Sequence, residues 1–382
     1  MNISKKKNMK RSLIVCVVVL TGCAQGSDES APAAQPEAAV ETTVLPNRLD
    51  AIVDELAKPG APYMAGDANT STHHMPYFLD SYAIRALCTQ YALEQKPQYL
   101  AAAQAWANRV LDDQAKMIPF GAYYMNYGLY RQPGQAHGDW YVADSSSIAQ
   151  AVLCTAHMSE HPDRIRYLES AQRFFDLVET NYINSDGGTS DGFWGDNRAS
   201  WWASTSIFGA FAIAMYNETG TTMYLQRALQ SFDWLSAADP ANFMPEGAPG
   251  VVLYIGEFFV QAWPLVRGTP REDLAKKQLR FFFDWMAANQ KSRNLDSPID
   301  YCAHGQTYMA GLPYLNFTYG APGGDEEVAY LRALLRSRID FANVVDWSLT
   351  AWAAWSESAQ LLALLPSPAS VTPGSTGLVA TN

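Results

Sequence analysis

The chain contains 382 residues, of which 48% are hydrophobic and 17% charged, and it carries a formal net charge of -11 at pH 7. This acidity argues against nucleic-acid binding and against docking on a membrane through a basic face. It also disfavours a polyanionic ligand, because like charges repel.

The first segment has the order of a secretory signal. Basic residues between Lys5 and Arg11 precede the apolar run SLIVCVVVL, which ends in Leu20-Thr21-Gly22-Cys23. This ending resembles the lipobox of bacterial lipoproteins, which implies cleavage before Cys23 and lipidation of that cysteine. Because Ala24 follows instead of Asp, we expect an outer-membrane lipoprotein that faces the periplasm or the cell surface. Its only membrane contact would be the lipid anchor.

The composition divides the whole chain into four segments. Residues 1–23 form the signal peptide and lipobox, and residues 24–45, rich in Ala, Glu and Pro, are expected to be a flexible linker. Residues 46–366 are expected to form one domain, and residues 367–382 a disordered tail. No later segment is long and apolar enough to span a bilayer.

A repeated Tyr-Leu pair opens a series of amphipathic helices. The pairs lie in QYLAAAQAWANRVL, RYLESAQRFFDLV, MYLQRALQSFDWL and AYLRALLRSRI, and REDLAKKQLRFFFDWM supplies a less regular copy. The copies recur roughly every 50 to 70 residues, which is the length of a helical hairpin with its loop. The sequence therefore predicts a repeated helical hairpin.

Helices of a second kind alternate with these. They include MPYFLDSYAIRALCTQYAL, DWYVADSSSIAQAVLCTAHM, WWASTSIFGAFAIAMYN and VVLYIGEFFVQAWPLV, which are apolar on nearly all sides, as buried helices are. The alternation predicts two concentric layers with the apolar helices inside. We therefore expect an all-α fold, an (α/α) toroid of about six helical hairpins, although an open helical solenoid gives a similar pattern. No stretch alternates as a β-strand does.

The loops that lead into the apolar helices are long and aromatic, whereas the loops that leave them are short. One of the long loops is SDGGTSDGFWGDNRASWW, at residues 185–202. A loop that only turned the chain would be short and polar. One end of the toroid is therefore expected to carry the candidate site. Its residues are His73, His74, Tyr124, Asn126, Tyr127, His137, Asp144, Asp191, Trp194, Asp196, Arg198, Trp201, Trp202, His304 and Tyr308.

Several polar residues lie within the apolar helices. Glu257 is the single charge in VVLYIGEFFVQAW, so it needs a partner inside the ring. Asp144 in VADSSSIA either serves the site or hydrogen-bonds the hydroxyl groups of inner helices. Cys88 and Cys154 lie late in two such helices, where they either pair or remain buried free thiols.

The chemistry of the loops favours a carbohydrate ligand. The chain has no GxSxG elbow, no GxxxxGK[ST] phosphate loop and no GxGxxG after a strand. It also lacks an HExxH motif, so we expect no metal and no cofactor. Sugar rings stack on Trp and Tyr, and their hydroxyl groups suit Asp, Asn and Arg. The loops hold these residue types.

The hairpin pattern, together with YFLDSYAIRAL, YYMNYG and GGTSDGFWGDNRASWWASTSIFGA, resembles the (α/α)-toroid polysaccharide lyases that cleave uronic-acid polymers such as alginate or glucuronan. The likeness covers the chain from about His73 to Trp355 and implies β-elimination on an acidic polysaccharide. The stretch from Trp201 through YNETGTTMYL is also similar to the unsaturated uronyl hydrolases. Their Trp-Ala-Arg-Gly-Gln segment is missing, because Trp202-Ala203 continues as Ser-Thr.

A lyase removes the C5 proton beside a uronate carboxylate, so it needs a base and groups that neutralise charge. We expect Tyr308 to transfer the proton, assisted by His304 one helical turn earlier. Asn126 and Arg198 are expected to neutralise the carboxylate, and His137 is also available for this chemistry. Substrate contacts are expected from His73, His74, Tyr124, Tyr127, Asp144, Trp194, Asp196, Trp201, Trp202 and Glu257.

Two alternatives remain open. A glycoside hydrolase needs carboxyl groups as acid and as base or nucleophile, for which Asp144, Asp196 and Glu257 are available. A lipid-anchored glycan-binding protein needs only aromatic stacking and no acid-base set. A turnover assay separates this binding protein from both enzymes.

Overall fold

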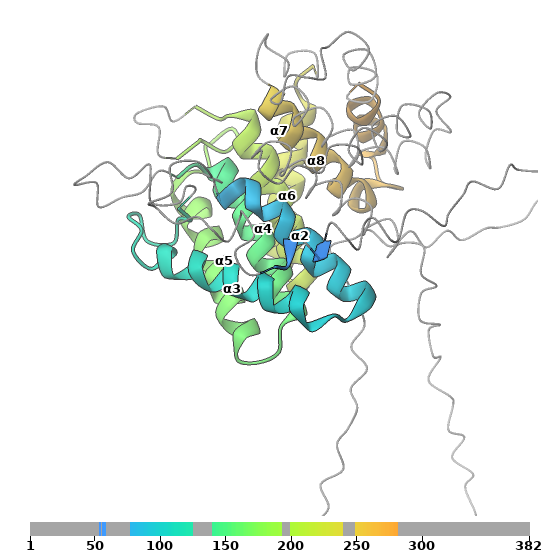
Figure 1. The fold of residues 1–382 in the computed structure, drawn as a ribbon. Helices are drawn as coiled ribbons and strands as arrows, with labels where there is room; N and C mark the ends of the chain where they lie inside the picture. Colours follow the sequence, from blue (N-terminus) through green and yellow to red (C-terminus); the bar gives the residue numbers. More distant parts are fainter. Residues whose placement is uncertain are drawn as a thin grey trace, which may run out of the picture.

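The computed structural model describes residues 53–54, 56–58, 77–124, 140–192, 199–239 and 249–281 (Figure 1). The predicted domain boundaries at residues 23, 45 and 366 lie outside these ranges. So do the predicted functional residues Cys23, His73, His74, Asn126, Tyr127, His137, Trp194, Asp196, Arg198, His304 and Tyr308.

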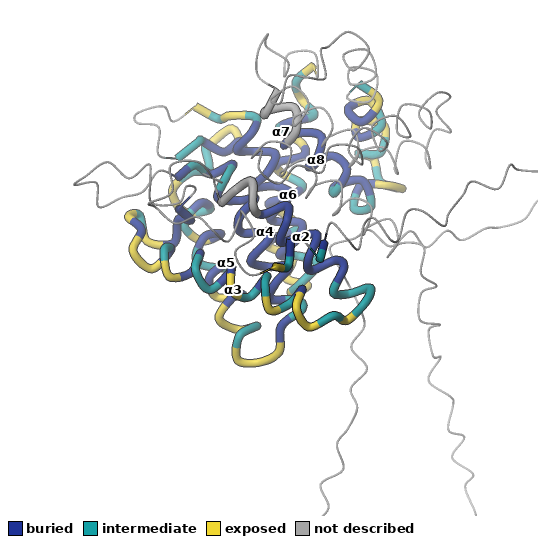
Figure 2. The backbone as a smooth tube through the Cα atoms, viewed as in Figure 1, coloured by how far each residue is buried: buried dark blue, intermediate teal, exposed yellow. Residues whose placement is uncertain are grey.

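Four helices form an inner layer. They are α2 (Tyr77–Glu94), α4 (Val142–Met158), α6 (Trp202–Thr219) and α8 (Pro249–Val266). Neighbours pack side by side in the order α2, α4, α6, α8 (Figure 1). Helices α4 and α6 are buried along most of their length (Figure 2), as their apolar composition predicted.

Three helices form an outer layer. They are α3 (Pro97–Gln114), α5 (Asp163–Asn181) and α7 (Thr222–Ser236). Helix α3 packs on α2 and α4, α5 packs on α4, and α7 packs on α6. Each buries one face, which in α5 includes Tyr167, Phe174 and Val178. Three of the predicted Tyr-Leu helices therefore exist and lie outside the apolar ones, whereas the predicted helix at Tyr330-Leu331 lies outside the described residues.

Small side chains let the inner helices approach one another closely. A Cβ atom on Gly209 of α6 would lie 2.6 Å from the ring of Phe258 on α8, so the packing there requires glycine. The buried serines of α4 are hydrogen-bonded: Ser146 Oγ donates to the Val142 carbonyl at 2.6 Å, and Ser145 Oγ donates to the Tyr123 carbonyl at 2.9 Å. Polar side chains on the inner helices can therefore be buried.

The described residues contain four of the expected hairpins. They are α2–α3, α4–α5, α6–α7, and α8 with the helix at residues 272–281. Over these ranges the regular secondary structure is helical, and the loops contain isolated β-bridges that pair Tyr141 with Gly192 and Ile183 with Thr189. None of the helices in this part of the chain is long and apolar enough to cross a membrane.

The two cysteines of the inner layer are buried free thiols, which is one of the two alternatives expected from the sequence. Cys88 lies on α2 and Cys154 on α4, and the Cys88 thiol together with burial raises the pKa of Cys154. Cys88 Sγ also lies 3.7 Å from Thr155 Oγ1. The pair therefore occupies the contact between α2 and α4.

Candidate active site

The loop that precedes α6 is fixed against the first turns of two inner helices. The N–H of Val142, at the start of α4, donates to the Asp191 carbonyl at 2.9 Å. The N–H of Trp201 donates to the Thr189 carbonyl, also at 2.9 Å. We call the loop at residues 182–192, with the first turns of α4 and α6, the N-terminal rim.

A glycine closes this loop over a buried tryptophan. Gly192 has a φ of +93°, and a Cβ atom there would lie 2.8 Å from the indole ring of Trp140. Trp140 in turn packs edge-on against Tyr182, with ring centroids 5.2 Å apart. Both the backbone conformation and the close approach require glycine at this position.

Asp144 lies in the first turn of α4 and is half-buried. The hydroxyl of Tyr254 on α8 donates a 2.7 Å hydrogen bond to Asp144 Oδ1. Burial raises the pKa of Asp144 to about 6, although the tyrosine hydrogen bond opposes the shift. Burial also raises the pKa of Tyr254, so its hydroxyl remains a neutral donor. Asp144 can therefore hold and release a proton close to neutral pH.

Glu257 has the partner that the sequence required. Arg85 on α2 donates to Glu257 Oε1 at 2.7 Å, and the two side chains are 5% and 1% exposed. The Tyr82 hydroxyl donates to Oε2 at 3.3 Å, and Gln261 Nε2 donates to Oε1 at 3.0 Å. These bonds offset the cost of burying the carboxylate. The carboxylate is therefore held by three side chains within the inner layer.

The side-chain contacts between the inner helices lie at successive depths below the N-terminal rim. Ser81 pairs with Ser147 at 2.7 Å, and Cys88 contacts Thr155 about two turns further on in both helices, so α2 and α4 run parallel. The Asp144–Tyr254 contact lies nearest the N-terminal rim. The Glu257 contacts and the 3.1 Å bond from Gln261 to Gln150 lie deeper. The half-buried carboxyl is thus at the rim, and the buried ion pair is beneath it.

Asp191 is a second carboxyl at the rim. Its Oδ1 is buried and has no hydrogen-bond partner in the part of the chain that the structure describes, whereas the residue as a whole is half-buried. Burial raises its pKa, and its own backbone N–H opposes the shift. Asp191 and Asp144 both lie at the rim, because the Asp191 carbonyl accepts from the first residue of the helix that carries Asp144.

The remaining predicted residues within the described ranges are aromatic. Trp201 is 40% exposed at the N-cap of α6, and Trp202, the first residue of the helix, is half-buried. Tyr124 is only 1% exposed, so its side chain belongs to the core beside Tyr123. The structure therefore brings Asp144 and Trp201 to the rim, and it places Glu257 and Tyr124 in the interior.

Sequence reasoning missed Arg85 and Tyr254. Arg85 lies in the apolar stretch SYAIRALCTQ, where it is the single charge, just as Glu257 is in its own helix. The same test of burial would have selected it. Tyr254 carries no comparable signal, because a tyrosine in an apolar helix usually fills the core.

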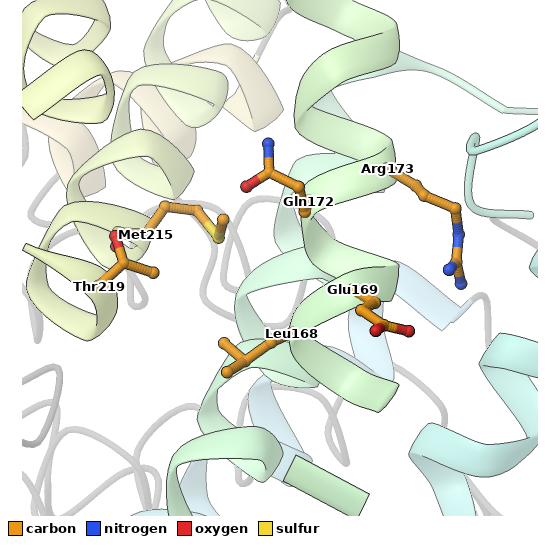
Figure 3. A pocket seen from close by; sticks show the side chains of 6 residues that line it. All are labelled: Leu168, Glu169, Gln172, Arg173, Met215 and Thr219. Carbon is orange, nitrogen blue, oxygen red and sulfur yellow. The ribbon is translucent and has the colours of Figure 1, made fainter. Parts of the chain in front are cut away.

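An open pocket lies away from these carboxyl groups, between α5 and the C-terminal part of α6 (Figure 3). It has a volume of about 390 Å³ and is lined by Leu168, Glu169, Gln172, Arg173, Met215 and Thr219. In Figure 3 Gln172 and Met215 point toward one another, and Arg173 points away. The Tyr224 hydroxyl donates to Gln172, and Arg173 donates to Gln114 at 3.2 Å. Because several of its polar groups are engaged, we do not place the active site there.

Comparison with known proteins identifies the fold. No protein-family model matches the sequence, and no curated protein matches it. The GH76A α-1,6-mannanase of Salegentibacter sp. HEL1_6 superposes with a TM-score of 0.55 at 12% identity, covering 82% of this chain and 99% of its own. The β-1,3-1,4-glucanase of Paenibacillus sp. X4 gives 0.56 at 10% identity, with coverages of 86% and 96%. This chain has the fold of an (α/α) toroid.

A toroid of different activity is equally similar. The cellobiose 2-epimerase of Spirochaeta thermophila gives a TM-score of 0.52 at 10% identity, covering 84% of this chain and 99% of its own. An inactive variant of the Salegentibacter mannanase, with two consecutive aspartates replaced by alanine, has been solved with α-1,6-mannotetrose. In this chain consecutive aspartates occur only at Asp112 and Asp113, on the outer helix α3, where Asp112 is exposed. The inner helices of the described residues therefore carry no consecutive pair of aspartates.

These neighbours correct the prediction of a polysaccharide lyase. That prediction rested on the hairpin pattern and on loop character, which toroids of different activities share. The similar structures are glycoside hydrolases and epimerases, and they are not uronic-acid lyases. The lyase prediction is therefore wrong, and the β-elimination in which Tyr308 and His304 were given roles no longer applies.

Proposed function

We propose that this protein is a glycoside hydrolase that cleaves a neutral glycan. The observation that carries the proposal is the environment of Asp144. This half-buried carboxyl lies in the first turn of an inner helix, receives a 2.7 Å hydrogen bond from Tyr254 and has a pKa raised to about 6. A carboxyl group of that kind is suited to protonate a leaving glycosidic oxygen.

The pKa matters because a general acid must carry its proton at the working pH. An ordinary aspartate is almost fully ionised at pH 6, whereas Asp144 is about half protonated there. General acid catalysis of this sort contributes on the order of 100- to 10,000-fold to a rate. Asp144→Asn keeps the acceptor for the Tyr254 hydroxyl but removes the transferable proton.

The charge of the chain supports a neutral substrate. A net charge of -11 repels a polyanion such as a uronic-acid polymer. The similar toroids are a mannanase, a glucanase and a cellobiose epimerase, whose named substrates are neutral sugars. The exposed indole of Trp201 at the rim also suits stacking on an uncharged sugar ring.

Release of reducing ends from a panel of neutral glycans tests the proposal. The panel contains α-1,6-mannan, β-1,3-1,4-glucan and cello-oligosaccharides. We expect one of them to be cleaved, and we expect Asp144→Asn to lower kcat by about 100-fold or more. Asp176→Asn, on the outer helix α5, is the matched control and should retain activity.

Three results would overturn the proposal. One is the absence of new reducing ends from any member of the panel. Another is interconversion of cello-oligosaccharides without cleavage, which an epimerase would give. The third is equal activity of the parent and Asp144→Asn, because the carboxyl would then not be the acid.

We also propose that the chain is anchored to the outer membrane through Cys23. The motive is the Leu20-Thr21-Gly22-Cys23 sequence followed by Ala24. Labelling with a palmitate analogue should mark the parent and Cys16→Ser, since Cys16 lies in the apolar run before the cleavage site. Cys23→Ser should carry no label, and labelling equal to the parent would contradict the anchor.

A further inference from the structure

The position of Asp191 is fixed by the backbone of the N-terminal rim. Its carbonyl accepts from Val142, the preceding Ser190 N–H donates to the Tyr182 carbonyl at 2.9 Å, and Thr189 is bonded to Trp201. The Thr189 N–H also donates to a hydroxyl on α6 at 2.9 Å. The loop therefore holds Asp191 from both sides, as a catalytic group needs to be held.

These bonds limit how far Asp191 can lie from Asp144. The antiparallel bridge pairs Tyr141 with Gly192, so Val142 and Asp191 face each other at the next position and share one hydrogen bond. Residues of a hydrogen-bonded antiparallel pair have α-carbons about 5.5 Å apart. Asp144 follows Val142 by two helical residues, which adds at most about 5.5 Å. The two α-carbons are thus no more than about 11 Å apart. A separation of about 6.5–9.5 Å between carboxyl groups, typical of inverting glycosidases, lies within reach.

The two carboxyl groups differ in their surroundings. Asp144 receives the Tyr254 hydroxyl, whereas the buried Oδ1 of Asp191 has no partner among the described residues. A buried acceptor without a hydrogen bond destabilises the fold, so an acceptor of this kind at the rim points to a partner that the substrate or its water supplies. Because burial disfavours its charged form and raises its pKa, the Asp191 carboxylate is a stronger base than an ordinary aspartate.

We propose that Asp191 is the second catalytic carboxylate of this site, the general base that takes a proton from the attacking water. The inference rests on the proposed hydrolase function and assigns the role that Asp144 leaves open. The water oxygen bonds to the anomeric carbon as the glycosidic bond breaks. One water proton passes to Asp191, and the leaving oxygen takes its proton from Asp144, so that the product anomer is inverted.

Substrates with different leaving groups separate the two roles. Dinitrophenolate leaves without being protonated, so an enzyme that lacks its acid still cleaves a 2,4-dinitrophenyl glycoside. The sugar of the dinitrophenyl glycoside is chosen to match the glycan that is cleaved, either α-mannose or β-glucose. On this substrate we expect the kcat of Asp144→Asn to stay within about tenfold of the parent value. Asp191→Asn should lose about 100-fold or more in kcat on the dinitrophenyl glycoside and on the glycan alike.

Asp186→Asn is the matched control in the same loop. Its carboxylate is occupied by the Ser200 hydroxyl at 2.6 Å, the Gly188 N–H at 2.9 Å and the Trp234 indole at 3.0 Å, so its role is to hold the loop. This variant should keep most of the activity on both substrates. Thermal unfolding of all three variants separates loss of a catalytic group from loss of the loop.

Each unfavourable result has its own meaning. If Asp191→Asn keeps more than a third of the parent activity while Asp144→Asn is defective, the base assignment fails and the hydrolase remains. Equal activity losses in Asp191→Asn and Asp186→Asn, with matching drops in Tm, would make the residue structural. Retention of the anomer in the first product, seen by NMR, would also overturn the base role. A parent that cleaves no glycan overturns the hydrolase itself.

Discussion

The guanidinium of Arg85 on α2 lies 2.7 Å from the carboxylate of Glu257 on α8, and only 5% and 1% of the two side chains are exposed. Removal of one partner leaves the other as an uncompensated buried charge. Arg85→Leu should therefore lower the free energy of unfolding by about 3–5 kcal/mol. Urea denaturation, followed by circular dichroism, measures the loss.

A surface ion pair with the same N···O distance is the control. Arg271 lies 2.7 Å from Asp233, but these side chains are 35% and 51% exposed, so water screens their interaction. Arg271→Leu should cost at most about 1 kcal/mol. Equal losses from the two leucine variants would contradict the argument that burial makes the inner pair important.

The raised pKa of Asp144 predicts a pH-dependent stability. The folded protein holds this proton up to about pH 6, whereas the unfolded chain releases it near the ordinary value of 3.8. The folded state therefore binds more protons between these values, and the stability contributed by the group is lost as the pH rises from about 4 to 6. The loss amounts to about 3 kcal/mol at most.

Asp144→Asn tests this sign directly, because the amide does not titrate. The difference in unfolding free energy between the variant and the parent cancels every other titrating group. That difference should move in favour of the variant by up to about 3 kcal/mol between pH 4 and pH 7. A difference that is constant over this range would contradict the raised pKa.

The layered fold could be predicted from the sequence because it rests on periodicity. The Tyr-Leu helices α3, α5 and α7 have one apolar face, and α4 and α6 are apolar all round, so burial alone assigns the layers. The partner of Glu257 could not be predicted in the same way. Arg85 is 172 positions away, and their contact depends on the ring that brings α2 and α8 together.

The prediction of the reaction class was wrong for a different reason. The part of the loop SDGGTSDGFWGDNRASWW at residues 185–192 is fixed against the start of α4 and belongs to the N-terminal rim, but the residue types in the loop do not select a reaction. Aromatic and acidic side chains serve lyases, hydrolases and epimerases of this fold alike. What separates these reactions is the placement of protons, and the pKa of Asp144 depends on burial by residues that are remote in sequence.

Tyr254 should set the pKa of the proposed acid, Asp144. Its hydroxyl lowers the pKa of Asp144 by bonding the charged form, so Tyr254→Phe should raise that pKa while keeping the ring. The alkaline limb of the kcat profile, at about pH 6 in the parent, should move to higher pH. Tyr224→Phe, on the outer helix α7, removes a hydroxyl that bonds Gln172 and should leave the limb unmoved. A limb that stays in place, or moves to lower pH, in Tyr254→Phe would contradict the assignment.

Alanine substitutions at two glycines of the rim loop distinguish the effect of backbone strain from the effect of displacing Asp191. Gly187 and Gly192 have φ values of +89° and +93°, so alanine is strained at both, by about 1–2 kcal/mol. A Cβ atom at Gly187 meets nothing within 4 Å, whereas one at Gly192 would lie 2.8 Å from the Trp140 ring. Gly192→Ala must therefore shift the loop next to Asp191, and we expect it to lose about tenfold or more in kcat.

Gly187→Ala should lose a comparable part of its stability to backbone strain and keep its kcat. Chemical denaturation gives the stability of both variants, and initial rates at saturating glycan give kcat. If the two alanine variants lost kcat equally, the strain common to both would explain the effect. The contact of Gly192 with Trp140 would then have no part in positioning Asp191, and the fixed rim would cease to be a reason for assigning that residue to catalysis.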